Sequence, residues 1–133
     1  MTDQAQQALA LYAGFLSLFF LILSLRVMLR RRATGIDLGT GQDPLLRRAV
    51  RAQANFCEYA PLALLLMVIS ASLGATAWLL HAAGAPLAVG RLIHAIGVSR
   101  EREDYRFRKA GIVLSLIPML LLGAALLARG FAS

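Results

Sequence analysis

Four long apolar segments constrain the fold of this 133-residue chain more than any other feature of its sequence. A helix of about 20 apolar residues, rising about 1.5 Å per residue, crosses the ~30 Å hydrocarbon core of a bilayer. The segments predict helices over about residues 8–29, 44–73, 75–98 and 108–128. We therefore expect an all-α membrane protein, a single domain in which four transmembrane helices form a bundle.

The composition agrees with this fold class. Hydrophobic residues make up 59% of the chain and its mean hydropathy is +0.67, whereas soluble domains are about 45–50% apolar. A loop with three glycines and two aspartates separates the first two helices, and Asp43-Pro44 is suited to start the second. The few residues around Gly74 are all that joins the second and third helices, which predicts a tight antiparallel hairpin.

The basic residues, which give a net charge of +7, flank the apolar segments. No zinc, homeodomain or RNA-binding motif accompanies them, so we expect no nucleic-acid partner. The positive-inside rule places the basic connections in the cytoplasm and both termini on the other side of the membrane. We expect lipid to surround the helices and the membrane to be a bacterial inner membrane. The first connection and its helix ends carry Arg30, Arg31, Arg32, Arg47, Arg48 and Arg51, and the last carries Arg100, Arg102, Arg106, Arg108 and Lys109.

A polar cluster lies where the second helix enters its apolar run. Arg51, Asn55 and Glu58 are spaced i, i+4, i+7, which puts them on one helical face. A carboxylate at this depth is costly unless it is paired or functional. Two interpretations follow: a charge-compensated network that docks the helix on a neighbour, or a binding site.

The stretch RAQANFCEYAP, Arg51 to Pro61, closely resembles the signature of the membrane-associated proteins in eicosanoid and glutathione metabolism, the MAPEG family. The likeness extends to the four helices and both basic loops, and it is strongest to the microsomal glutathione transferases and leukotriene C synthases. The resemblance implies a homotrimer that binds glutathione between neighbouring subunits and uses it as a cosubstrate, without a metal. The family also includes isomerases, peroxidases and a non-catalytic member.

By motif position, the resemblance assigns residues to glutathione binding. Glutathione carries two carboxylates and one ammonium, and the arginine fork binds carboxylates in bidentate fashion. Glu58 would then meet the ammonium. The second helix supplies Arg51, Gln53, Asn55, Glu58 and Tyr59, the end of the first supplies Arg30 and Arg31, and GRLIH in the third supplies Arg91 and His94. For His94, a packed helix histidine is an equal alternative.

The catalytic arginine of the conjugating enzymes begins the fourth helix and stabilises the glutathione thiolate. Arg108 and Arg106 are the candidates, and R-x-x-G favours Arg108; a charge that merely ends the membrane span is the alternative. Val98 stands where the family often has a tyrosine, for which Tyr105 could substitute. Cys57 is expected to be a small packed residue.

Three functions therefore remain open. The first is a glutathione transferase or peroxidase that acts on lipophilic electrophiles from the bilayer. The second is a non-catalytic scaffold or lipid-binding protein that retains the anion pocket. The third, a small four-helix transporter, is disfavoured because Ala8 to Leu25 contains no carboxylate. The thiol itself could be glutathione or another low-molecular-weight thiol.

Overall fold

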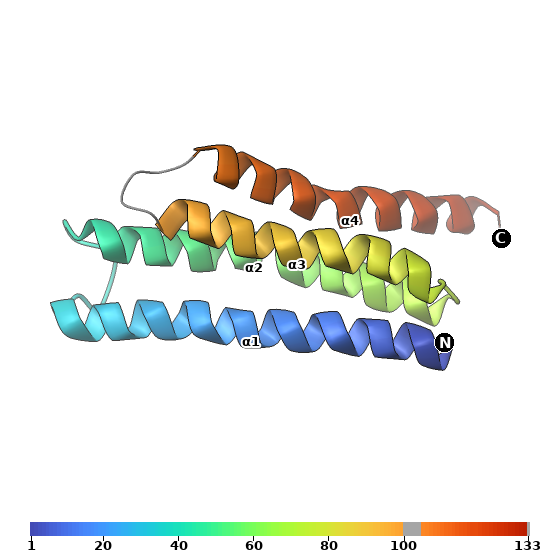
Figure 1. The fold of residues 1–133 in the computed structure, drawn as a ribbon, viewed down its shortest axis with the longest axis horizontal. Helices are drawn as coiled ribbons and strands as arrows, with labels where there is room; N and C mark the ends of the chain where they lie inside the picture. Colours follow the sequence, from blue (N-terminus) through green and yellow to red (C-terminus); the bar gives the residue numbers. More distant parts are fainter. Residues whose placement is uncertain (100–104, 133) are drawn as a thin grey trace.

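The computed structural model describes residues 1–99 and 105–132 and contains four helices: α1 (Asp3–Thr34), α2 (Pro44–Ser72), α3 (Ala77–Ser99) and α4 (Tyr105–Phe131). All four are long and apolar enough to cross a membrane. The predicted all-α, four-span fold is therefore confirmed. Both termini and the α2–α3 connection lie at one end of the molecule, while the α1–α2 loop lies at the other (Figure 1). Arg100 and Arg102 fall outside the described residues.

Helix α1 extends about five residues beyond its predicted bounds at each end. The Thr2 side chain caps its first turn by accepting a hydrogen bond from the Ala5 amide at 3.3 Å. At the other end Gly35 adopts φ +67°, the left-handed conformation that ends helices, and its amide donates to the Arg31 carbonyl. The basic cluster 30–32 therefore completes α1 instead of following it.

Two arginines of α1 order the loop that leads to α2. The Arg31 guanidinium donates to the carbonyls of Ile36, Asp37 and Gly39 at 2.9–3.1 Å. Arg30 donates to the Asp43 carboxylate at 2.6 and 3.1 Å, while that carboxylate caps α2 by accepting from the Leu46 amide at 2.7 Å. The loop therefore fixes the start of α2, from which the polar cluster projects.

The Asp43 carboxylate makes the connection between α1 and α2 sensitive to acid. The hydrogen bond from Arg30, followed by that from the Leu46 amide, holds the pKa of Asp43 below its ordinary value. Because the pKa is lower in the native state than in the unfolded state, ionised Asp43 stabilises the native state at any pH above its unfolded-state pKa. This stabilisation is lost as the pH falls through the native-state pKa. We expect Asp43→Asn to be less stable than the wild type at pH 7 and to show a smaller loss of stability below about pH 4. Thermal unfolding in detergent at several pH values measures this, and identical acid profiles would contradict it.

The α2–α3 connection is a tight turn, as predicted. The Leu73 amide donates to the Ile69 carbonyl, and Gly74 follows with φ +87°, which an L side chain rarely adopts. The Ala75 amide then returns to the Ser70 carbonyl at 2.9 Å. These bonds end α2 and turn the chain directly into α3.

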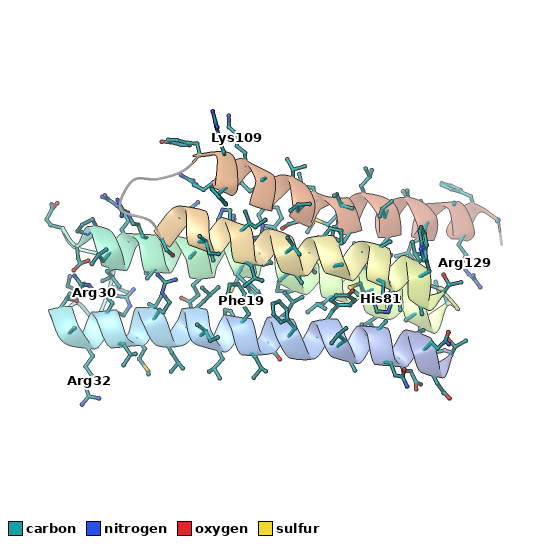
Figure 2. The ribbon with its side chains drawn as sticks, viewed as in Figure 1. Phe19, Arg30, Arg32, His81, Lys109 and Arg129 are labelled. Carbon is teal, nitrogen blue, oxygen red and sulfur yellow. The ribbon has the colours of Figure 1, made fainter. Side chains whose placement is uncertain are left out.

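Helices α2 and α3 form the centre of the molecule, with α1 on one side and α4 on the other (Figure 1). Phe19 of α1 points towards this centre, whereas Arg32 and Lys109 point away from the helices (Figure 2). Large apolar side chains cover the outside, and only 22% of the most apolar stretch of α1 or of α4 is buried. In a membrane protein such surfaces face lipid or another subunit.

Helices α3 and α4 approach closely because glycines line their contact. A side chain built on Gly111 would place its Cβ 2.6 Å from the His94 Cβ and 2.7 Å from the Gly90 carbonyl oxygen. A Cβ on Gly97 would lie 2.9 Å from the Phe107 Cβ. Small residues allow transmembrane helices to approach in this way. The close α3–α4 contact brings the start of α4, with its arginines, against the C-terminal third of α3.

Candidate functional site

The polar face of α2 lines a cavity of about 540 Å³, as large as many small-molecule pockets of roughly 300–1,000 Å³. Helices α3 and α4 supply the opposite wall. The lining residues are Arg47, Arg48, Arg51, Asn55, Glu58, Tyr59, His94, Val98, Arg108 and Ile112. Six of the eleven predicted site residues are therefore brought together by three helices.

The charges of this cavity are strongly unequal. Among the described residues of the lining, four arginines, Arg47, Arg48 and Arg51 from α2 and Arg108 from α4, surround one carboxylate, that of Glu58. An anion with several acceptor groups suits such a lining, because each guanidinium offers a planar fork of N–H donors. The single carboxylate leaves a place for one positive group on the same ligand.

Arg91 lies behind the cavity wall, not in its lining. Its side chain is 2% exposed and bridges three helices. The guanidinium donates to the Asn55 Oδ1 at 2.7 Å and the Asn55 carbonyl at 3.1 Å on α2. On α4 it donates to the Ser115 Oγ at 2.8 Å and the Gly111 carbonyl at 3.1 Å. Its charged carbon also lies 4.9 Å from the centre of the Tyr59 ring, a cation–π distance.

Asn55 connects this buried cation to Glu58, the one carboxylate that the described residues contribute to the cavity. While its Oδ1 accepts from Arg91, its Nδ2 donates to Glu58 Oε2 at 3.1 Å. Asn55 is 5% exposed, whereas Glu58 is exposed. The residues of the predicted polar face therefore differ in burial. The Asn55 amide is largely buried, whereas the charged side chains of Arg51 and Glu58 reach outward.

The α3 wall combines packing with exposure to the cavity. His94 is 4% exposed, and its Cβ lies against Gly111 of α4, yet it lines the cavity. His94 is therefore both a packed helix residue and a residue of the cavity lining, the two alternatives given by the sequence. Val98 lines the cavity one turn later, at the position where the resemblance leads us to expect tyrosine, and it has no hydroxyl to donate.

At the start of α4 the structure distinguishes the two candidate arginines. Arg108 is half-buried and lines the cavity, whereas Arg106 is exposed and does not. The Arg108 guanidinium carbon lies 5.6 Å from the centre of the Tyr105 ring. Tyr105 itself is exposed and is not part of the lining, so Arg108 is the better placed of the two arginines to meet a bound ligand.

Three predicted binding residues lie elsewhere in the single chain. Arg30 and Arg31 hold the α1–α2 loop, and Gln53 donates to Ser24 Oγ of α1 at 3.0 Å. They occupy the α1 side of α2, away from the cavity. A role for them in glutathione binding stays a prediction that requires a second subunit.

Some features of the site were not anticipated from the sequence. Arg47 and Arg48 line the cavity, and their position one turn before Arg51 could have indicated this. Nothing in the sequence marked Ser115 as a partner of Arg91. Cys57, expected to be packed, is exposed instead, because the α2 face that carries it has no neighbouring helix within the described chain.

The sequence is similar to a known protein family and to curated bacterial proteins. The model of the MAPEG family matches residues 9–128, which span all four helices and every lining residue of the cavity. The chain belongs to the MAPEG family. The chain is also similar to the inner membrane protein YecN of Escherichia coli, from strain K12 and from strain CFT073, with 32% identity over 113 residues, which is 85% of each chain. No solved structure matches the sequence. With four spans and this relative, the MAPEG protein described here is a multi-pass inner membrane protein.

Proposed function

We propose that this MAPEG protein binds glutathione in the cavity between α2, α3 and α4 and uses its thiolate in one of two reactions. The thiolate is conjugated to a lipophilic electrophile, or it attacks the outer oxygen of a lipophilic hydroperoxide, which breaks the O–O bond, releases the alcohol and oxidises the thiol to a sulfenic acid. The observation that carries the proposal is the charge pattern of the lining outside residues 100–104, four arginines around one glutamate. Glutathione has the complementary pattern of two carboxylates and one ammonium. The bilayer delivers apolar substrates along the exposed apolar helices.

Each arginine and the glutamate of the lining have a definite task in this proposal. Arg47, Arg48 and Arg51 bind the carboxylates, and Glu58 accepts from the ammonium. Arg108 faces the thiol and favours its ionised form, because a nearby cation lowers a thiol pKa. The thiolate sulfur attacks the electrophilic carbon, a carbon–sulfur bond forms, and the leaving group departs with its electron pair. Arg30, Arg31 and Gln53 complete the site from a neighbouring subunit of a homotrimer.

Glutathione binding by the purified protein in detergent tests the first step. We expect Glu58→Gln to weaken binding about 10-fold, because a neutral amide replaces the ionic partner of the ammonium, a loss of about 1.4 kcal/mol. Isothermal titration calorimetry gives the dissociation constants. Asp37→Asn, the same chemical change in the α1–α2 loop and outside the cavity, is the matched control and should bind like the wild type. Equal affinities for all three proteins would argue against the assignment.

The second candidate is a non-catalytic protein whose cavity receives anionic lipid head groups. The same arginine-rich lining favours it, since a basic residue near an anionic membrane surface contributes about 1 kcal/mol of attraction. Thermal unfolding separates the two functions. Glutathione at 100 times its dissociation constant should stabilise the protein by about 2.7 kcal/mol. Stabilisation by anionic lipid but not by glutathione would favour the second candidate.

A further inference from the structure

The buried Arg91 has an arrangement that a merely structural bridge does not need. Four of its five N–H donors are engaged, and its nearest hydrogen-bonding partners are neutral groups: an amide, a hydroxyl and two backbone carbonyls. A buried arginine is costly to desolvate, so a neutral residue could hold these helices at lower cost. The geometry around Asn55 suggests what the cation contributes.

Arg91 fixes which end of the Asn55 amide faces the cavity. A guanidinium has only donors, so the atom 2.7 Å from its Nη1 must be the amide oxygen. The amide nitrogen is thereby directed to Glu58, whose Oε2 accepts from it at 3.1 Å. Without Arg91 the amide could turn, present its oxygen to the carboxylate and repel it.

We infer that Arg91 is a positioning residue, which acts through Asn55 to hold one oxygen of Glu58 and leave the other for the ammonium of glutathione. This inference rests on the proposed function. It differs from the expectation drawn from the family resemblance, in which Arg91 touches glutathione itself, because its guanidinium is buried behind the wall. Arg91 would therefore determine selectivity for the free amino group of the ligand.

The test compares glutathione with N-acetylglutathione, in which a neutral amide replaces the ammonium. Wild-type protein in detergent should bind glutathione about 10-fold more tightly, and Arg91→Lys should reduce this ratio to about 2-fold. Lysine keeps the charge but lacks the fork that reaches both oxygens of Asn55. In turnover, the change should appear in KM for glutathione and not in kcat, because Arg108 and the thiol are unaffected.

A double-mutant cycle distinguishes positioning from general support of the fold. If Arg91 acts through Asn55, Arg91→Lys should change affinity less than 2-fold once Asn55 is alanine. Ser115→Ala is the matched control: it removes a different Arg91 bond, on the α4 side, and should retain the selectivity for glutathione. Arg91→Gln provides a second variant. Its amide carries an acceptor as well as donors, so it no longer fixes which end of the Asn55 amide faces Glu58, and it should also reduce the ratio to about 2-fold.

Several results would overturn the inference. One is that Arg91→Lys prefers glutathione to N-acetylglutathione as strongly as the wild type does. Another is that the effects of Arg91→Lys and Asn55→Ala on affinity multiply in the double mutant, as they would for independent residues. Failure of both Arg91 variants to fold, judged by circular dichroism and size-exclusion chromatography, would show that Arg91 supports the helices instead. Failure of the wild type to bind glutathione is a separate result and refutes the proposed function itself.

Discussion

Arg108→Ala is expected to lower kcat/KM for conjugation of glutathione to a nitroaryl halide about 100-fold at pH 7. A free thiol with a pKa near 8.5 is only about 3% ionised at this pH. If the guanidinium lowers the thiol pKa by about two units, the thiolate fraction rises to about 76%, a gain of about 25-fold. Loss of a fixed positive charge beside the reacting sulfur accounts for the remainder.

The pH dependence separates this effect from a loss of folding. The variant's pH–rate profile should shift upward by about two units, so its deficit should narrow from about 100-fold at pH 7 to about 5-fold near pH 9. Arg106→Ala removes the same charge from the exposed neighbouring position and should change kcat/KM less than 2-fold. A profile of unchanged shape in Arg108→Ala, or equal losses in both variants, would contradict the assignment.

Gly111→Ala should destabilise the protein by about 3 kcal/mol, the upper end of the usual range for an overpacked contact. Its new Cβ would meet the His94 Cβ at 2.6 Å and the His94 amide nitrogen at 2.7 Å. Backbone atoms cannot rotate away, so α3 and α4 must separate. The separation would also stretch the bonds from Arg91 to Ser115 and to the Gly111 carbonyl.

Gly123→Ala, twelve residues further along α4, is the control for this prediction. Nothing lies within 4 Å of a Cβ built at Gly123, and alanine is a better helix former by about 1 kcal/mol. It should therefore leave stability unchanged or raise it. Thermal unfolding in detergent measures both variants, and a similar change in both would show that the α3–α4 contact is not tight at Gly111.

The membrane-spanning organisation followed from the sequence because hydropathy is a local property. Each apolar run must be helical in lipid to satisfy its own backbone, whatever its neighbours are. Gly74 marked the hairpin for an equally local reason, since it supplies a positive φ that other residues avoid. The common face of Arg51, Asn55 and Glu58 followed from the 100° rotation per residue.

What lies opposite each face depended on the packing of separate helices. The hydropathy pattern did not predict which residues bind Arg91. Asn55 and Ser115 surround it because α2 and α4 pack against α3 at this point. The same packing leaves Cys57 exposed and places Gln53 against α1, where it donates a hydrogen bond to Ser24. Helical periodicity specifies which residues share a face, but it does not specify which neighbour the face meets.

From its sequence alone, this protein was determined to be a four-span membrane protein with a basic polar cluster on one face of its second helix, because both properties arise within single helices. The tertiary structure alone decided that Arg108 and not Arg106 reaches the cavity, and that Arg91 lies behind its wall. The physical reason is that close approach of α3 and α4 along Gly90 and Gly111 sets the rotation and depth of their side chains.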